Sequence, residues 1–293
     1  MIELRDVTVR FGSTVAVDDV RLDLPTGKIY GLLGRNGSGK TSLLSALASY
    51  RRPTAGTVRF DGVDAFENPA VMRHTCFIRD TLDVSDSERV RAVLRVAGWM
   101  RPGWDADYAA RLADLFELDP SKRVSALSRG RRSALGVVLG LASRAPLTIL
   151  DETYLGMDAV ARADFYRELL ADYLAHPRTI ILSTHLIEEV ADLLERVVIL
   201  DRGRVLLHAE ADELRGRGIK VTGPDTVVAD FAAGHHVLAE QSLGGVRAVT
   251  LDWRPAPDDV ARGEAAGLTF GPVGIQDLFV HLTSPSQRLE ALR

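Results

Sequence analysis

Cysteine is almost absent from this sequence. Cys76 is the single cysteine in 293 residues, and one cysteine excludes both a disulfide framework and a cysteine-based zinc site. We therefore expect a protein of a reducing compartment. Lysine is also scarce, because only Lys28, Lys40, Lys122 and Lys220 occur among 36 basic residues. The net charge of −4 argues against a protein whose main function is to bind nucleic acid.

Long apolar runs are missing as well. No stretch approaches the roughly 18 apolar residues of a membrane span. The first residues, Met1–Asp6, mix charged and apolar side chains, so no secretory signal is expected. Apolar residues make up 46% of the chain and charged residues 26%, which is ordinary globular composition and excludes disorder. The length favours about two domains.

Short apolar segments alternate with helical patterns over most of the chain, which predicts an α/β domain whose parallel sheet is covered on both faces. The middle, from about 84 to 143, is expected to be helical, with Ser128 as an N-cap. A hairpin of 197–200 and 205–207 closes this part. The predicted strands are 2–8, 16–23, 28–33, 56–60, 147–150 and 179–182, and helices are predicted after the glycine-rich turn at 34–39 and over 159–174.

From about residue 212 the pattern changes to short elements between glycine-rich breaks. Their order, β-α-β-β-α-β-α, is compatible with a ferredoxin-like domain. We expect one domain over 1–211 and a small α+β domain over 212–293. The pair His235-His236 suggests a metal site, but neighbouring residues of a strand point to opposite faces, so no metal is expected there.

A phosphate-binding loop follows the apolar segment 28–33. Residues 34–41, Gly-Arg-Asn-Gly-Ser-Gly-Lys-Thr, match G-x-x-x-x-G-K-[ST] between a strand and an amphipathic helix. Glycines let the backbone N–H groups point at phosphates, and the helix N-terminus adds positive charge. The lysine neutralises the β- and γ-phosphates, and the threonine hydroxyl reaches Mg²⁺. The candidate nucleotide-binding residues are Gly34, Asn36, Gly37, Ser38, Gly39, Lys40, Thr41 and Ser42.

Two carboxylates end a second apolar strand, Leu147–Glu152. Ligands of open α/β sheets bind at the carboxyl ends of the strands. We expect Asp151 to hold Mg²⁺, directly or through water. We expect Glu152 to polarise the attacking water, because phosphoryl transfer requires positioning and charge neutralisation.

Further motifs make the pattern specific. The segment Leu127-Ser128-Arg129-Gly130-Arg131 resembles the L-S-G-G-Q signature of ABC-transporter ATPases, and it lies between the phosphate loop and the carboxylate strand, as in that family. His185 resembles the family's switch histidine, and residues 156–158 resemble its D-loop. Phe11 stands where the family places an aromatic ring that stacks on adenine. The resemblance covers about residues 1–208.

The resemblance implies a P-loop NTPase (RecA-like) sheet with a helical signature subdomain, and it implies ATP and Mg²⁺ as ligands. It also implies a head-to-tail dimer, in which each ATP lies between the phosphate loop of one subunit and the signature of the other. Ser128 and Gly130 would then serve the partner's nucleotide, and Asp158 would be the D-loop contact. Lys40, Glu152 and His185 would be the catalytic residues, with His185 contacting the γ-phosphate. The purely structural alternatives are that Ser128 is only an N-cap and that Phe11 is only a core residue.

Four positions depart from the family's pattern. Arg129 and Arg131 alter the signature, and Thr153 stands where the family usually has proline. The glutamine that touches Mg²⁺ and the transmembrane partner has no evident counterpart, and Asp80 is the best positional match. An aspartate at this place is a candidate Mg²⁺ ligand with a shorter reach.

Three functions fit these observations. The first is the ATP-hydrolysing subunit of a transporter, peripheral on the cytoplasmic face of the cell membrane, which drives a separate permease, with export favoured. The second is a soluble ABC-type ATPase that acts as a regulatory switch. The third is one half of an asymmetric heterodimer whose other subunit supplies a standard signature. For the domain over 212–293 we expect one of three roles: binding a small regulator, aiding dimerisation or contacting the permease. Nucleic acid is not expected as a partner.

Overall fold

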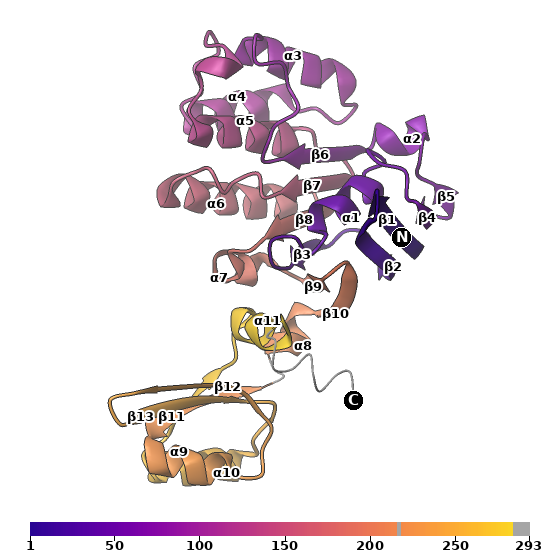
Figure 1. Cartoon of the computed structure of the whole chain (residues 1–293). Helices are drawn as coiled ribbons and strands as arrows, with labels where there is room; N and C mark the ends of the chain where they lie inside the picture. Colours follow the sequence, from indigo (N-terminus) through magenta and orange to yellow (C-terminus); the bar gives the residue numbers. More distant parts are fainter. Residues whose placement is uncertain (216–217, 284–293) are drawn as a thin grey trace. The chain divides into compact units, whose positions relative to one another are not determined.

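A mostly parallel sheet lies at the centre of the first of two units (Figure 1). The computed structural model describes residues 1–215 and 218–283. The first unit comprises Met1–His185 and Val198–Leu207, and the second comprises Leu186–Val197 and the residues from His208 on. The pairs β3–β8, β8–β7 and β7–β6 are parallel. The strand order is β10 (Arg204–Glu210), β9 (Arg196–Asp201), β3 (Ile29–Leu33), β8 (Thr179–Thr184), β7 (Leu147–Asp151) and β6 (Thr75–Arg79).

Helices cover both faces of this sheet, as the continuous apolar strands predict. Every residue of β3, β7 and β8 is buried. Ile149 belongs to the core under α1 (Lys40–Leu47), whereas a Cβ on Gly140 of α5 (Arg129–Ala142) would lie 2.7 Å from Leu150. Because adjacent residues of a strand point to opposite faces, α1 and α5 lie on opposite sides.

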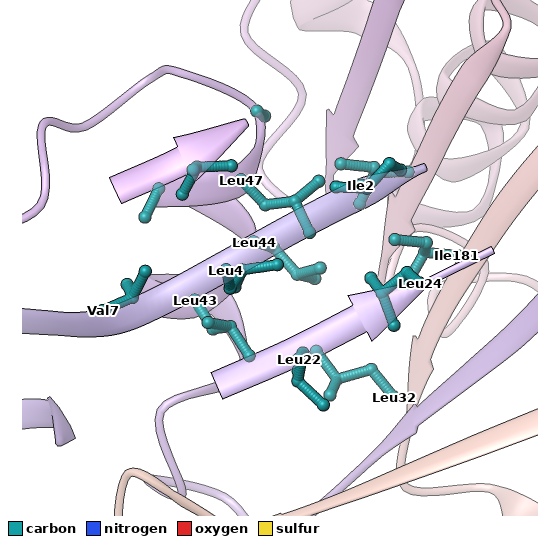
Figure 2. Close-up of a cluster of buried hydrophobic side chains, with 14 of the residues drawn as sticks. Ile2, Leu4, Val7, Leu22, Leu24, Leu32, Leu43, Leu44, Leu47 and Ile181 are labelled. Atoms are coloured by element: carbon teal, nitrogen blue, oxygen red, sulfur yellow. The ribbon is translucent and has the colours of Figure 1, made fainter. Parts of the chain in front are cut away.

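A second, antiparallel sheet packs against α1. Its order is β2 (Thr14–Leu24), β1 (Ile2–Phe11), β4 (Ala55–Phe60) and β5 (Val63–Asp64). Figure 2 shows the apolar side chains of this sheet meeting those of α1 and the parallel sheet. The cluster includes Leu4 and Val7 of β1, Leu22 and Leu24 of β2, Leu43, Leu44 and Leu47 of α1, Leu32 of β3 and Ile181 of β8.

The segment predicted to be helical contains three helices and one 3₁₀ turn. They are α3 (Val90–Met100), α4 (Ala106–Leu115), η1 (Val124–Ala126) and α5. Two further helices of this unit are α2 (Pro69–Met72) and α6 (Ala159–Ala175). The short elements α2 and β5 were not predicted, since segments of four and two residues show no periodicity.

The second unit contains a four-stranded antiparallel sheet with helices α9 and α10 along one face (Figure 1). Its strand order, β12-β13-β11-β14, with all neighbours antiparallel, is that of the predicted ferredoxin-like topology. The elements are β11 (Ile219–Pro224), α9 (Asp225–Ala232), β12 (Val237–Leu243), β13 (Val246–Leu251), α10 (Pro257–Ala265), β14 (Thr269–Pro272) and α11 (Ile275–Thr283).

The described residues of this unit also contain three short helices, α7 (Ile187–Val190), η2 (Ala191–Leu193) and α8 (Ala211–Arg215). Residues 186–197 thus belong to the second unit, although the sequence pattern places them before the change at residue 212. The domain division at 211 and 212 stays a prediction. The rings of His235 and His236 have different neighbours, Trp253 and His281 respectively.

Within residues 1–215 and 218–283, no helix has both the length and the apolar character needed to cross a membrane.

A buried ion pair connects α6 to Arg178, the residue before β8. The Asp172 carboxylate lies 2.6 Å from the guanidinium of Arg178 and 3.4 Å from that of Arg144, and the side chains of Asp172 and Arg178 are 3% and 5% exposed. Removing one partner leaves a charge in a low-dielectric interior, which is far more costly than losing an exposed pair.

We expect Asp172→Ala to lower the free energy of unfolding by about 3 to 5 kcal/mol, because Arg178 stays buried without its carboxylate. The measurement is urea unfolding followed by circular dichroism. Asp83→Ala is the control, because it removes the partly exposed Arg79–Asp83 pair and is expected to cost at most about 1 kcal/mol. Equal losses in the two variants would contradict the prediction.

Candidate functional site

The loop between β3 and α1 has a backbone that only glycine allows. Gly39, the N-cap of α1, has φ 103°, and a Cβ there would run into the carbonyl oxygen of Ala16. A Cβ on Gly34 would lie 2.6 Å from the carbonyl oxygen of Leu200. Gly37 has φ 78° and open space around its Cα, so the backbone there is accessible. The loop therefore presents bare backbone at a helix N-terminus, which is an anion-binding arrangement.

A groove of about 520 Å³ lies over this loop. Its position fits a nucleotide whose phosphates rest on the loop and whose base extends toward Phe11. Phe11 is half-exposed, and the guanidinium of Arg51 lies 3.9 Å from the centre of its ring. Nine of the predicted residues line the groove together with Thr14 and Ala16: Phe11, Asn36, Gly37, Ser38, Gly39, Lys40, Thr41, Ser42 and Glu152.

Lys40 is held at the floor of the groove. Its ammonium donates to the carbonyl oxygen of Gly34 at 2.8 Å and lies 3.5 Å from the Glu152 carboxylate. The side chain is only 6% exposed. It also donates to the carbonyl oxygen of Arg35 at 3.4 Å, so three oxygens hold the buried ammonium at the loop, where its positive charge favours an anion.

Asp151 is the buried carboxylate of the site. It ends β7 at 3% exposure, and within the described residues its Oδ1 has no hydrogen-bond partner. Burial raises the pKa of this carboxyl, and the hydroxyls of Ser183 and Thr41 partly oppose that rise. An unpaired buried carboxylate oxygen beside a threonine hydroxyl suits Mg²⁺, which takes oxygen ligands and supplies the missing positive charge. These residues therefore fit a magnesium ion.

Glu152 is held in an unusual backbone conformation. Its φ is 52°, in the left-handed region that residues other than glycine rarely adopt. Its N–H donates to the carbonyl oxygen of Ser183. One carboxylate oxygen lies 3.5 Å from Nζ of Lys40 and 3.5 Å from Nδ1 of His185. His185 directly follows β8, and its ring is half-exposed. Glu152 and His185 thus stand together at the carboxyl edge of the sheet.

A second hollow, of about 280 Å³, contains the signature residues. Ser128, Gly130 and Asp158 line it, and none of the eleven residues of the loop groove does. The Ser128 hydroxyl accepts the backbone N–H of Arg131, so Ser128 is the N-cap of α5, as the sequence predicts. Asp158 caps α6 through the N–H of Ala161. The cap positions leave both side chains at the start of a helix, facing the same hollow.

Two of the positions that depart from the family, Arg131 and Thr153, have a structural explanation. The Arg131 guanidinium donates to the Phe116 carbonyl and pairs with Glu117, so it is bound within its own subdomain. The Thr153 hydroxyl donates a hydrogen bond to the carbonyl oxygen of Ile78. Proline has no side-chain donor and would not form this hydrogen bond. Asp80 directly follows β6, whose last residue is in register with Asp151. The Asp80 side chain is exposed, and no hydrogen bond or ion pair of it is found in the described part of the chain.

Sequence patterns did not single out two residues of the site. Ser183 is fully buried beside Asp151, and it precedes the Thr-His pair that marks the switch. The available signal was its position two residues before His185. Arg51 covers one face of the Phe11 ring from the turn after α1. No local pattern pairs residues 40 positions apart, so only the fold reveals that contact.

We expect Asp151→Asn to raise the melting temperature of the nucleotide-free protein at pH 7.5 in the presence of EDTA. Because the folded pKa is raised, the ionised carboxylate destabilises the fold above that pKa, and the penalty vanishes as the pH falls below the unfolded value. A gain of about 1 kcal/mol would raise the midpoint by about 2 to 4 °C.

Calorimetry between pH 7.5 and pH 4 checks this expectation, and the difference from wild type should shrink toward the acid end. Asp80→Asn is the matched control, since the same change at an exposed residue just after the neighbouring strand β6 should leave the midpoint unchanged. A lower midpoint for Asp151→Asn at pH 7.5 would show that the carboxylate stabilises the fold.

Comparisons with known proteins agree with the site. The family model described as ABC transporter matches residues 17–154. The ABC transporter ATP-binding protein YtrB of Bacillus subtilis is 30% identical over 221 residues, covering 75% of this chain and 76% of that protein. The spermidine/putrescine import ATP-binding protein PotA of Pseudomonas aeruginosa is 33% identical over 298 residues, covering 94% and 78%.

The fold comparison gives the same result. The dimeric structure of a bacterial ABC transporter cassette superposes with a TM-score of 0.64 at 20% identity, covering 72% of this chain and 99% of the cassette. At this identity the comparison shows a shared fold over the part of the chain that it covers, and nothing more. With the loop groove, the buried carboxylate and the separate signature hollow in one chain, the protein belongs to the ATP-binding subunits of ABC transporters and is an ATPase that uses ATP and Mg²⁺.

Proposed function

We propose that two copies of this chain close head to tail around ATP and drive a separate membrane permease. The observation that carries the proposal is the separation of two half-sites. The loop groove holds the phosphate-binding and catalytic residues, and the signature hollow holds Ser128, Gly130 and Asp158, with no lining residue in common. A second copy, turned by a two-fold axis, would complete each groove with a signature hollow.

The side chains of the groove then have distinct roles. Thr41 and Asp151 would hold Mg²⁺, which neutralises phosphate charge when bound. Lys40 would bind the β- and γ-phosphates from its buried position. Glu152, kept in place by its backbone and by Lys40 and His185, would orient a water and accept its proton. His185 would contact the γ-phosphate from the end of β8. Phe11, with Arg51 behind it, would support the adenine.

We place the permease on an apolar surface at α3. A hollow of about 390 Å³ lies between α3 and β6 and is lined mainly by apolar residues, Ile78, Val93 and Met100 among them. Met100 is 68% exposed, and its neighbour in the chain, Trp99, is 78% exposed. Large exposed apolar side chains around a hollow are typical of a protein-binding surface. We propose export as the direction, supported by Asp80 in place of the family's glutamine and by the second unit.

Glu152→Gln should trap the closed dimer. The amide keeps the shape of the side chain but accepts no proton, so hydrolysis should fall by about 100-fold or more. On adding Mg-ATP we expect the mass by light scattering to double from 31.9 kDa. Lys40→Ala in the same background is the control, because it removes the phosphate contact and should stay monomeric. A Glu152→Gln protein that binds ATP and stays monomeric would contradict homodimer closure and favour a heterodimer.

Trp99→Glu should abolish co-purification with a multi-span membrane protein from cells that express the tagged chain. A charge at this place opposes burial against an apolar partner. ATP-driven dimerisation should be unaffected, because Trp99 lies outside both half-sites. Leu174→Glu on α6 is the matched control, with a similarly exposed apolar side chain on another helix. Loss of the membrane partner in both variants would remove α3 as the docking surface.

A further inference from the structure

The Phe11 ring stands at the end of a hairpin and is only partly packed. Phe11 is the last residue of β1 and pairs with Thr14, the first residue of β2. Gly12 follows with φ 58°, and the ring is half-exposed. A ring with half of its surface in water keeps rotational freedom that is lost when a base stacks on it. A neighbour that fixes the ring beforehand therefore strengthens the binding of the base.

Arg51 is such a neighbour. Its guanidinium carbon lies 3.9 Å from the centre of the Phe11 ring, well within the range of a cation–π contact. The Nη2 group of the same guanidinium donates to the carbonyl oxygen of Arg10 at 3.1 Å. One side chain thus holds both the ring and the residue before it. It covers one face of the ring and leaves the other face for a ligand.

The backbone around this contact is fixed on both sides. The Arg51 N–H donates to the carbonyl oxygen of Ser45 in α1 at 3.0 Å. Thr54 accepts the Arg10 N–H through its hydroxyl at 3.0 Å and donates its own N–H to the carbonyl oxygen of Thr8 at 2.7 Å. The turn after α1 is therefore tied to the end of β1. Because α1 starts at the phosphate loop, the ring is held at a defined place relative to that loop.

Arg51 itself lies outside the groove. Phe11 lines the loop groove, whereas Arg51 is not part of the lining that the described residues form. The next residue, Arg52, makes a similar contact elsewhere, because its guanidinium lies 5.4 Å from the centre of the Phe66 ring. Neither of these two described residues lines the groove. An effect of Arg51 on a bound base would therefore pass through the Phe11 ring, and Arg52 offers a matched comparison.

We propose that Arg51 is the positioning residue of the base subsite: it holds the Phe11 ring ready for adenine and strengthens the binding of adenine nucleotides without contacting them. The inference rests on the proposed support of adenine by Phe11. The phosphate part of the affinity comes from the glycine loop and Lys40, so it should not depend on Arg51. The base part should depend on Arg51 and only while the Phe11 ring is present.

Calorimetry with Mg-ADP tests the proposal on the whole chain, because ADP binding involves neither hydrolysis nor dimer closure. Arg51→Gln should weaken Mg-ADP binding about 3- to 10-fold, as expected for a lost cation–π contact and a less ordered stacking ring. Binding of inorganic tripolyphosphate, which has no base, should be unchanged. Phe11→Ala should itself weaken Mg-ADP binding about 5- to 100-fold. In that background, Arg51→Gln should have no further effect.

Two further variants separate the contact from the charge. Arg52→Gln makes the same charge change one residue away, at an arginine that contacts Phe66, and should leave the Mg-ADP affinity unchanged. Arg51→Lys keeps the positive charge and loses the planar guanidinium, so its affinity should fall between those of Arg51→Gln and wild type. In steady-state hydrolysis, Arg51→Gln should raise the KM for ATP and leave kcat and the melting temperature unchanged.

The outcomes are distinguishable. If Phe11→Ala leaves Mg-ADP binding unchanged, the proposed support of adenine by Phe11 is overturned, and the proposal for Arg51 falls with it. If Phe11→Ala weakens binding and Arg51→Gln does not, only the role of Arg51 is overturned. An equal loss of tripolyphosphate binding in Arg51→Gln would show that its charge acts on the phosphates. A loss that persists without the Phe11 ring would show a direct contact with the nucleotide. Either result would also overturn the proposal.

Discussion

The parallel register of β3, β8 and β7 is the constraint on which the site depends. It aligns Leu33 with Thr184 and Asp151 with Ser183, so three chain segments far apart in sequence end at one edge. The glycine loop begins one residue after Leu33, Glu152 one residue after Asp151, and His185 one residue after Thr184. A slip of one residue in the pairing of β7 with β8 would take Asp151 out of register with Ser183 and turn it to the other face of the sheet. Because both faces are covered by apolar helices, that slip is strongly disfavoured.

Burial at this edge determines how the charges behave. Asp151 has lost most of its water and has no complete set of hydrogen bonds in return. Lys40 faces carbonyl oxygens and a carboxylate, and Glu152 occupies a backbone region that costs energy. The fold thus keeps a buried carboxylate that a bound cation would stabilise. The surrounding core stabilises the chain enough to tolerate the cost of burying this charge.

Much of this arrangement follows from local sequence. The loop at 34–41 has a spacing that fixes which backbone groups face a ligand, and the apolar run before Asp151 identifies a buried strand. The β-α-β-β-α-β-α order of the second unit also follows from its short apolar segments and glycine-rich breaks, and it is compatible with the strand order that the structure has. Contacts between distant residues do not follow. The stacking of Arg51 on Phe11 and the bond from Thr153 to Ile78 depend on how separate elements meet. The same holds for the pairing of Arg131, on α5, with Glu117, two residues after the end of α4.

The boundary between the two units has a consequence for communication. The first unit ends its long segment at His185, and the second begins at Leu186. The histidine next to Glu152 is therefore joined to the second unit by one peptide bond, without an intervening linker. A linker of many residues would absorb a displacement by rotating its own dihedral angles, whereas a single peptide unit has only the two dihedrals on either side in which to do so. The chain passes between the units at two further places, Val197–Val198 and Leu207–His208, and of the three connections only the first follows directly on a residue beside Glu152.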